Sequence, residues 1–548
     1  MKKYLIFLIS LTAILTTWAQ EQKKQLKLIS TEYTVRNDNE IPGAVILTGK
    51  VHFEHDGANI FGNKVYFFQK EQYIKVFGDV QMTQGDSINL VGNYAEYNAK
   101  DQLAFIADQV KLRSKESTLV TDTIFYNRNI QQAYYNSKGV IVSNENVLTS
   151  NKGIYDINQK KFIFRSNVEL KNPTTTLKTN HLDYYEKSGH AYVSGPTNMI
   201  KSNGDNLYTE NGFYDTKNNI AKIQKNAKIY QKDKVIEGDN LFYDEKKGYA
   251  RGENNIKITD TVNKLFVTGH YGEVFRAKDS MYITKKALVK YLVEKDTAYF
   301  HAKYINVVGP EGKKVLRGYN DARFYKSDMS GKCDSLVSIQ EQGITKFLKN
   351  PVFWSNNSQI TGDKIHLLSD SLNKHIDSLK VLNNAFIIQK DTLGTGYNQM
   401  KGINLFGKFK ENKLSVIDLI KNTESIYYVY DKEQLIGIEK AACSKIRLTL
   451  DNNKIKTITR YDNPNSPIYP ENEFPENARK FRGFVWRGDE EIKSLDDLFP
   501  QSELDYDTQA GKKKVTIDKE NLKPLEIFEE TLLINDPKHK TNKAKPKK

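Results

Sequence analysis

Gly238-Asp239-Asn240-Leu241-Phe242-Tyr243-Asp244 is one copy of a pattern that recurs through the first half of the chain. In each copy a polar residue is followed four positions later by tyrosine, and usually then by Asn or Asp. The six tyrosines are separated by 29, 29, 29, 30 and 29 residues, and they are Tyr97, Tyr126, Tyr155, Tyr184, Tyr214 and Tyr243. A fixed period of this length indicates a repeat architecture in which each unit packs on its neighbours.

A second marker keeps the same period at a different phase. It consists of two apolar residues separated by one residue, so both side chains share one face of a strand. The pairs are Val51 and Phe53, Val80 and Met82, Val110 and Leu112, Val140 and Val142, Val168 and Leu170, Ala227 and Ile229, and Ile256 and Ile258. Each repeat is therefore expected to hold at least two short strands in fixed register.

The rest of the chain up to about residue 460 also favours strands. No helical period is found there, and the whole chain has 32 Tyr and 26 Phe but 3 Trp. Two tight hairpins are predicted, with Phe409 opposite Leu414 and Leu450 opposite Ile455. Eight of the 13 prolines follow Tyr461, which argues against central strands in that segment. A short helix is expected around residues 494–498.

The N-terminus has the features of a secretory signal. Lys2 and Lys3 precede an apolar run at residues 5–15, and residues 17–19 form a plausible cleavage site. The run is too short to span a membrane as a helix, so the mature protein is expected to be exported and soluble. The net charge of +15 falls to +13 without the two lysines. This charge favours an anionic glycolipid, phospholipid headgroup or acidic polysaccharide, although a basic surface kept for solubility explains it equally well.

No chemical motif points to catalysis, a cofactor or a metal. His52 and His55 are three residues apart, so a strand directs them to opposite faces, and solvated histidines are the simpler interpretation. Cys333 and Cys443 are too few for a disulfide framework, and they are free or joined by one incidental bridge. Protease, esterase, P-loop and dinucleotide-binding motifs are missing from the sequence. We expect no enzyme, and export disfavours nucleic acid as a partner.

The export signal and the repeated unit Gly-Asp-x-Leu/Ala-x-Tyr-Asp, followed by Gly/Asn-x-Val-x-Phe/Leu, resemble the OstA-like (organic solvent tolerance) family of periplasmic lipopolysaccharide-transport proteins. The resemblance is good over residues 25–300 and looser to about residue 490. It implies an all-β fold, an elongated open β-jelly roll of stacked short antiparallel strands. It also implies a periplasmic protein, with association to the outer membrane left open. The implied partners are lipopolysaccharide, bound by its lipid A chains, and other jelly-roll transport proteins or further copies, joined end to end through terminal strands.

The predicted organisation has five parts. They are a signal peptide at 1–19, OstA-like jelly-roll repeats at 25–300, a second and looser jelly-roll region at 301–460, a Pro-rich extension at 461–500 and a disordered Lys-rich tail at 501–548.

The periodic side chains have two interpretations. In an open trough they contact lipid, and the candidate lining residues are Val51, Phe53, Val80, Met82, Val110, Leu112, Val140, Val142, Val168, Leu170, Ile229, Ile256 and Ile258. In a closed array the same side chains form a core. The repeated tyrosines likewise either close each repeat or lie at the rim of a trough, near a glycolipid headgroup.

Two other functions remain open from the sequence. One is an exported β-solenoid that binds polysaccharide or acts in adhesion, which requires a closed core and aromatic ladders on its surface. The other is a polysaccharide lyase on a parallel β-helix, for which the sequence shows no cluster of Asp, Arg and Lys.

Overall fold

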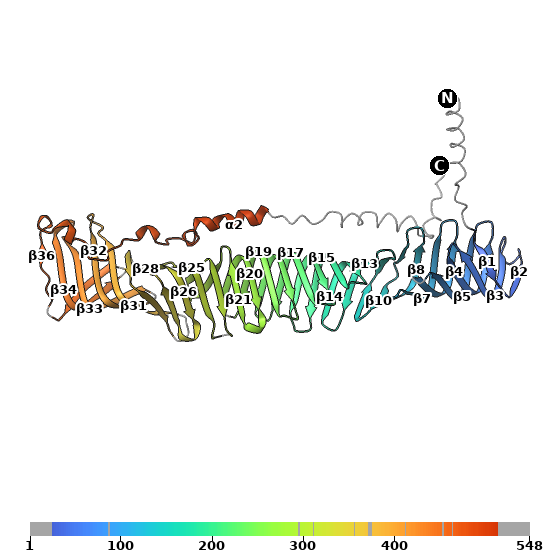
Figure 1. Cartoon of the computed structure of the whole chain (residues 1–548), viewed down its shortest axis with the longest axis horizontal. Helices are drawn as coiled ribbons and strands as arrows, with labels where there is room; N and C mark the ends of the chain where they lie inside the picture. Colours follow the sequence, from blue (N-terminus) through green and yellow to red (C-terminus); the bar gives the residue numbers. More distant parts are fainter. Residues whose placement is uncertain are drawn as a thin grey trace, which may run out of the picture. The chain divides into compact units, whose positions relative to one another are not determined.

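The computed structural model describes residues 25–512, except 86–87, 263, 294–295, 311, 356, 371–374, 412, 452–453 and 463. The predicted signal peptide and residues 513–548 of the predicted tail lie outside this range. Contacts divide the chain into two units, residues 1–498 and 499–548, and each is described by itself. In the first unit, strands of one antiparallel sheet follow one another in chain order (Figure 1). The stacked-strand, all-β fold predicted from the repeats is confirmed.

The strands of the first half of the stack are β1 (Lys27–Ser30), β2 (Tyr33–Arg36), β3 (Val45–His55), β4 (Ala58–Phe68), β5 (Tyr73–Gln84), β6 (Ile88–Asn98), β7 (Leu103–Arg113), β8 (Ser117–Asn127), β9 (Gln132–Tyr135), β10 (Gly139–Ser143), β11 (Asn146–Ser150), β12 (Lys152–Asp156), β13 (Lys161–Lys171), β14 (Thr175–Tyr185), β15 (His190–Lys201), β16 (Asn206–Asp215), β17 (Ile220–Gln231), β18 (Lys234–Asp244), β19 (Tyr249–Asp260) and β20 (Leu265–Phe275).

The stack continues with β21 (Ser280–Thr284), β22 (Leu288–Val293), β23 (Asp296–His301), β24 (Tyr304–Val308), β25 (Val315–Lys326), β26 (Met329–Ile339), β27 (Ile344–Leu348), β28 (Val352–Ser355), β29 (Ser358–Thr361), β30 (Lys364–Ser369), β31 (Ile376–Lys390), β32 (Tyr397–Lys410), β33 (Lys413–Asp431), β34 (Gln434–Asp451), β35 (Lys454–Tyr461) and β36 (Ile468–Tyr469). Short 3-10 helices are η1 (Arg276–Lys278), η2 (Gln340–Gln342), η3 (Glu471–Glu473), η4 (Glu476–Ala478), η5 (Gly488–Glu490) and η6 (Asp496–Leu498).

Alternate long strands bend at their middle, and the bend recurs with the sequence period. In β5 the bend is at Gly78 and Asp79, whose φ angles are 72° and 45°, and the pairing with β6 shifts there. Gly, Asn and Asp tolerate this left-handed backbone better than other residues, and a bulge bends the strand that carries it. Each bent strand therefore contributes its two halves to two walls, whose inner side chains form one continuous core.

The two tight hairpins predicted late in the chain are confirmed. Phe409 pairs with Leu414 between β32 and β33, and Leu450 pairs with Ile455 between β34 and β35. The short helix expected around residues 494–498 is the 3-10 helix η6. The strands also continue past the predicted boundary at residue 300, because β23 spans it.

The predicted disorder from Gln501 onward is wrong for residues 501–512, which form helix α2 (Gln501–Lys512) in the second unit. Glu503 lies in the first turn of α2, where its charge complements the helix dipole, and its backbone N–H donates to the carbonyl of Pro500. Among the described residues, no helix is both long and apolar enough to cross a membrane.

Residues 464–498, here called the return segment, run back across the outer face of strands that precede them in the chain. The side-chain amide of Gln399 in β32 donates to the carbonyl of Arg479 at 2.7 Å and accepts from the N–H of Phe481 at 3.0 Å. Gln359 in β29 makes the same pair of bonds with Val485 and Arg487, at 2.7 and 2.6 Å. The segment therefore crosses the strands in the reverse of chain order.

An aromatic cluster lies beneath the return segment, on the outer face of β31, β33 and β34. It contains Phe386, Ile388, Ile426, Tyr428 and Ile438 from the strands and Phe474 and Phe481 from the segment. Further along, Lys332 and Arg487 hold the carboxylate of Glu490 at 3.0 and 2.7 Å. The Pro-rich extension is thus an ordered cover for one face of the sheet.

We expect acid to loosen the return segment. The hydrogen bonds from Arg487, with Lys332, lower the pKa of Glu490 to about 2, whereas an unfolded glutamate titrates near ~4.3. A lowered pKa stabilises the folded state above the unfolded pKa, and this stabilisation is lost as the pH falls toward 2. Tryptophan emission, which in the described residues comes from Trp486 in the segment and Trp354 in β28, should shift to longer wavelength between about pH 4 and 2 as Trp486 is released.

The matched variants are Glu490→Gln and Glu476→Gln, both in the return segment. Glu490→Gln should show the shifted emission already at neutral pH, while Glu476→Gln, at an exposed position, should keep the acid transition. An unchanged acid transition in Glu490→Gln would show that other groups hold the segment.

Candidate functional site

The candidate site is the apolar interior between the two walls. Of the predicted lining residues, eleven are buried in the continuous core: Val51, Phe53, Val80, Met82, Val110, Leu112, Val168, Leu170, Ile229, Ile256 and Ile258. Phe53 of β3 and Phe67 of β4 belong to different walls, and the centroids of their rings are 5.1 Å apart. The two walls therefore touch directly. A void among Ile229, Ile256 and Ile258 measures only about 10 Å³. The interior of this part is closed in the structure.

Two of the predicted lining residues lie on the outer face instead. Val142 is 47% exposed, and in β10 the inward residues are Gly139, Ile141 and Ser143. In β5, Val80 takes the first inward position after the bulge. In β10, the residue at the equivalent position, directly after the bulge residue Lys138, is Gly139. The Tyr135 ring fills the space at this glycine, where a Cβ would lie 2.4 Å from the ring. The apolar pair Val140 and Val142 is therefore displaced by one residue, which reverses its face.

The repeated tyrosines form one cross-strand row on the inner face, here called the tyrosine row. Neighbours in the row are paired residues of adjacent strands, so each tyrosine alternates with a residue that is usually alanine. Tyr184, Ala191, Tyr214, Ala221, Tyr243 and Ala250 follow one another in this way. All six tyrosines of the repeat are at most 2% exposed. Their rings are part of the core, at the margin where the turns of the two walls meet.

The tyrosine hydroxyls tie the two walls together along this margin, here called the seam. Each hydroxyl forms a hydrogen bond to a side chain that lies 31 to 42 residues away in the chain. The pairs are Tyr97 with His55 at 2.6 Å, Tyr126 with Gln84 at 2.7 Å, Tyr155 with Glu186 at 2.9 Å, Tyr184 with Asn146 at 3.2 Å, Tyr214 with Thr175 at 2.7 Å and Tyr243 with Asp205 at 2.8 Å. The tyrosines close each repeat, as one of their two interpretations required.

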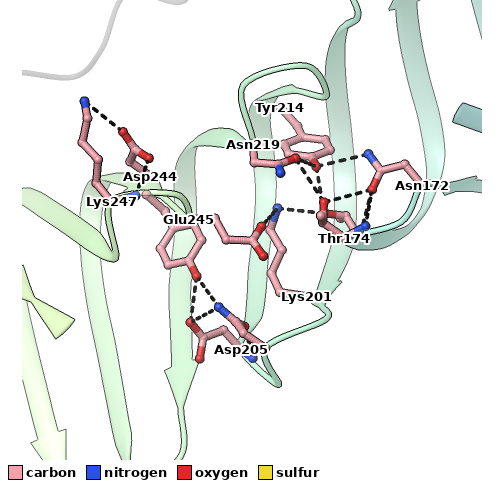
Figure 2. A network of polar contacts seen from close by, with 12 residues as sticks. Asn172, Thr174, Lys201, Asp205, Tyr214, Asn219, Asp244, Glu245 and Lys247 are labelled. Atoms are coloured by element: carbon pink, nitrogen blue, oxygen red, sulfur yellow. Dashed lines mark hydrogen bonds and ion pairs between the residues drawn. The ribbon is translucent and has the colours of Figure 1, made fainter. Parts of the chain in front are cut away.

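Buried charges reinforce the seam beside its last two tyrosines, Tyr214 and Tyr243 (Figure 2). The Lys201 ammonium is fully buried, lies 3.3 Å from Glu245 and 2.9 Å from the Thr175 hydroxyl, and sits over the Tyr214 ring. Arg276 reaches Asp205 at 3.1 Å beside the Tyr243 hydroxyl. Removing one member of such a buried network leaves its partners without compensation, so the seam is held as a connected unit. Burial also raises the pKa of Tyr126 to about 12, which keeps its hydroxyl protonated as a donor.

The interior opens farther along the stack, where a cavity of about 150 Å³ lies between β20 to β25 and β26 to β31. Its walls are largely apolar and include Leu265, Tyr291, Phe300, Leu316 and Phe324. Lys314, Gln340, Ser369 and His375 supply polar groups. An apolar cavity of this size can stay dry and accept a small apolar group. The sequence carries a signal for it in the alternating pairs Val289-x-Tyr291 and Ala298-x-Phe300, but the weak period of this region hid it.

Reactive groups are few in the interior. His52 and His55 lie on opposite faces as predicted, but His55 is not solvated: it is 1% exposed and bridges to Tyr97. Cys333 and Cys443 are free thiols, and burial raises the pKa of Cys333 to about 12, so it is protonated at neutral pH. No group of three or more potential metal ligands occurs among the described residues.

We expect Tyr214→Phe to weaken the seam. The Thr175 hydroxyl and the Asn219 carbonyl oxygen, 2.7 and 3.0 Å from the Tyr214 hydroxyl, would lose a buried partner, at a cost of about 1–3 kcal/mol. Urea unfolding should show the loss, and amide exchange should accelerate mainly in neighbouring repeats because each repeat contacts only those beside it.

Tyr192→Phe is the matched control for this substitution, because Tyr192 is 46% exposed on the outer face. Its unfolding free energy should stay within about 0.5 kcal/mol of the native value. Equal effects of the two substitutions would mean that the tyrosine hydroxyls do not hold the walls.

Two family models match the N-terminal part of the chain. Residues 23–180 match the sequence model described as OstA-like protein, and residues 147–249 match that described as LptA/(LptD N-terminal domain) LPS transport protein. Among solved structures, LptH, the LptA homologous periplasmic component of the lipopolysaccharide transport device of Pseudomonas aeruginosa, matches at 15% identity. That match covers 26% of this chain and 99% of LptH, with a TM-score of 0.21. The search of curated proteins finds no match. Over residues 23–249, the chain is thus similar to OstA-like proteins and to LptA-type lipopolysaccharide-transport proteins, which agrees with the resemblance carried by the repeats.

Proposed function

We propose that this protein is a periplasmic carrier in lipopolysaccharide transport, which moves the glycolipid toward the outer membrane through its apolar interior and has no catalytic step. The observation that carries the proposal is the match of residues 147–249 to the model described as an LPS transport protein, next to the OstA-like match over residues 23–180. Nine of the eleven candidate lining residues that face inward, from Val51 to Ile229, lie in the same part of the chain.

The interior has the chemistry that such a carrier needs. Each buried methylene of an acyl chain contributes about 0.8 kcal/mol, so a few apolar repeats can hold a lipid with several chains. Successive repeats present nearly the same side chains, such as Val80 and Met82, then Val110 and Leu112. A lipid can therefore move from one repeat to the next with little change in free energy. Since the walls touch in this part of the structure, they must separate to admit a chain.

The ends of the stack offer edges for partners with the same fold. Among the described residues, β1 and β2 pair only with β3, and Leu28, Ile29, Tyr33 and Val35 are 40 to 68% exposed. Unpaired, apolar strand edges add a strand from another chain readily. We propose that another jelly-roll transport protein, or a second copy of this chain, extends the sheet there.

Site-specific photocrosslinking in the native envelope tests the carrier function. Crosslinkers at the inward positions Phe53, Leu112 and Ile229 should label lipopolysaccharide. Crosslinkers at the outward positions His52 and Lys111, next to two of these, should not. Labelling confined to the outward positions would rule out transport through the interior.

A second candidate function, binding of a polysaccharide on the outer face, is favoured by one observation. Rings of adjacent strands form a continuous ladder with centroids 4.9 to 6.4 Å apart, namely Tyr66, Phe77, Tyr94, Phe105, Phe125 and Tyr134. Together with the closed core of this part, the ladder meets the requirement set from the sequence for a surface glycan binder.

The two functions make different predictions for the ladder. If the outer face binds glycan, the double variant Tyr94→Ala/Phe105→Ala should bind envelope polysaccharide at least tenfold more weakly in a pull-down. Lipopolysaccharide labelling at Leu112 should stay unchanged in that variant. Unaltered polysaccharide retention would eliminate this second function.

A further inference from the structure

The tyrosine row changes composition after β18, within one continuous set of paired residues. Ala250 pairs with Val274, and the row continues through Met281, Val307 and Leu316. The positions that earlier hold tyrosine are now Val274, Val307, Ser338 and Leu367. Valine and leucine form no hydrogen bonds, and the Ser338 hydroxyl lies 2.9 Å from Thr345 on the adjacent strand of its own wall. The tyrosine hydroxyls that close the seam therefore do not continue into this part of the row.

The cavity begins where the tyrosines end. Val307, Leu316, Ser338, Thr345 and Leu367 all belong to the row, and all five line the 150 Å³ cavity. Replacement of a long aromatic side chain by short ones thus removes both the bridge between the walls and the volume that fills the interior. The sequence difference and the opening have one physical cause.

The rim of the cavity carries a buried ammonium group. Lys314 lines the cavity and lies 2.7 Å from Asp260, and its side chain is 13% exposed. An ammonium has three donors, so the pair with Asp260 leaves donors for a phosphate oxygen. The cavity combines apolar walls with a cation at its rim, which suits an anionic amphiphile.

The backbone beside the cavity is interrupted at the corner between the walls. β21 ends at Thr284 and β22 begins at Leu288, while β23 ends at His301 and β24 begins at Tyr304. In the closed part, β3 to β8 and β13 to β19 run through the same corner as continuous strands, whereas β1 and β2, β9 and β10, and β11 and β12 are divided there. Walls joined by short connections instead of continuous strands can separate with fewer broken ladder hydrogen bonds.

We propose that lipopolysaccharide enters the interior sideways at this cavity, with an acyl chain between Phe300 and Leu316 and an anionic group at Lys314. This inference rests on the proposed carrier function. The tyrosine-closed part receives lipid from the cavity along the stack and not directly through its own seam.

The order of loading tests the inference. Purified protein with a photocrosslinker at Phe300, Leu316, Phe53 or Leu112 is mixed with lipopolysaccharide micelles and illuminated after increasing times. Labelling at Phe300 and Leu316 should be at least tenfold stronger than at Phe53 and Leu112 at the earliest times. Equal early labelling at all four positions would overturn sideways entry but leave the carrier function intact. Labelling at none of them would count against both.

Two pairs of variants locate the opening. Ser338→Tyr restores a tyrosine to the row and fills the cavity, so labelling at Phe300 should fall at least fivefold. Val337→Tyr, at the neighbouring residue that faces the other side of β26, should leave the labelling at Phe300 unchanged.

Lys314→Glu should also reduce the labelling at Phe300 at least fivefold, whereas Lys313→Glu, at a solvent-exposed ion pair with Glu341, should have less than a twofold effect. Unfolding midpoints establish that each variant is folded, and full labelling in folded Ser338→Tyr or Lys314→Glu would overturn the proposal.

Discussion

The hydrogen bond between a buried tyrosine hydroxyl and a side chain of the opposite wall is the interaction on which the closed part of this protein depends. A sheet bent at its middle has two walls that nothing in the strand ladder holds together, because ladder hydrogen bonds run only between neighbouring strands. The tyrosine ring fills the interior near the seam, and its hydroxyl satisfies a polar group that would otherwise be buried without a partner. The 29-residue period repeats this one bridge from Tyr97 to Tyr243.

The bent strands and the tyrosines depend on each other. A strand bends where two residues with left-handed backbone interrupt the alternation of inward and outward side chains. Beyond the bend, apolar side chains face inward again only if the number of residues at the bend is right. The 29-residue spacing preserves that count through most repeats. At Lys138 and Gly139 the number of residues at the bend differs by one, so a glycine takes the inward position. The Tyr135 ring fills the space that a side chain would occupy there. The fold absorbs such an offset locally because each repeat packs only against its neighbours.

Sequence periodicity predicted the strands, their inward faces and the terminal hairpins well, because each depends on residues close together in the chain. The predicted inward face was wrong for Val140 and Val142, because the sequence pattern of an apolar pair is the same whichever side of the strand the pair faces. The partners of the tyrosines, the cavity at Phe300 and the path of the return segment were not predicted. Gln359 and Gln399 contact residues 80 to 128 positions later, and single-sequence patterns carry no record of such contacts. The change from tyrosine to valine at Val274 was visible, but its meaning required the paired strands.

Because the repeats are equally spaced, the length of the sheet is set by the number of repeats. One 29-residue unit supplies two strands, and neighbouring strands lie about 4.8 Å apart, so a whole unit inserted or deleted changes the reach of the sheet by roughly 10 Å. Such a change preserves the inward faces and the corner, because the inserted segment meets the same neighbours on both sides. A protein of this kind can be made longer or shorter by duplication or loss of one short segment of its gene, with no change to the strands at its two ends.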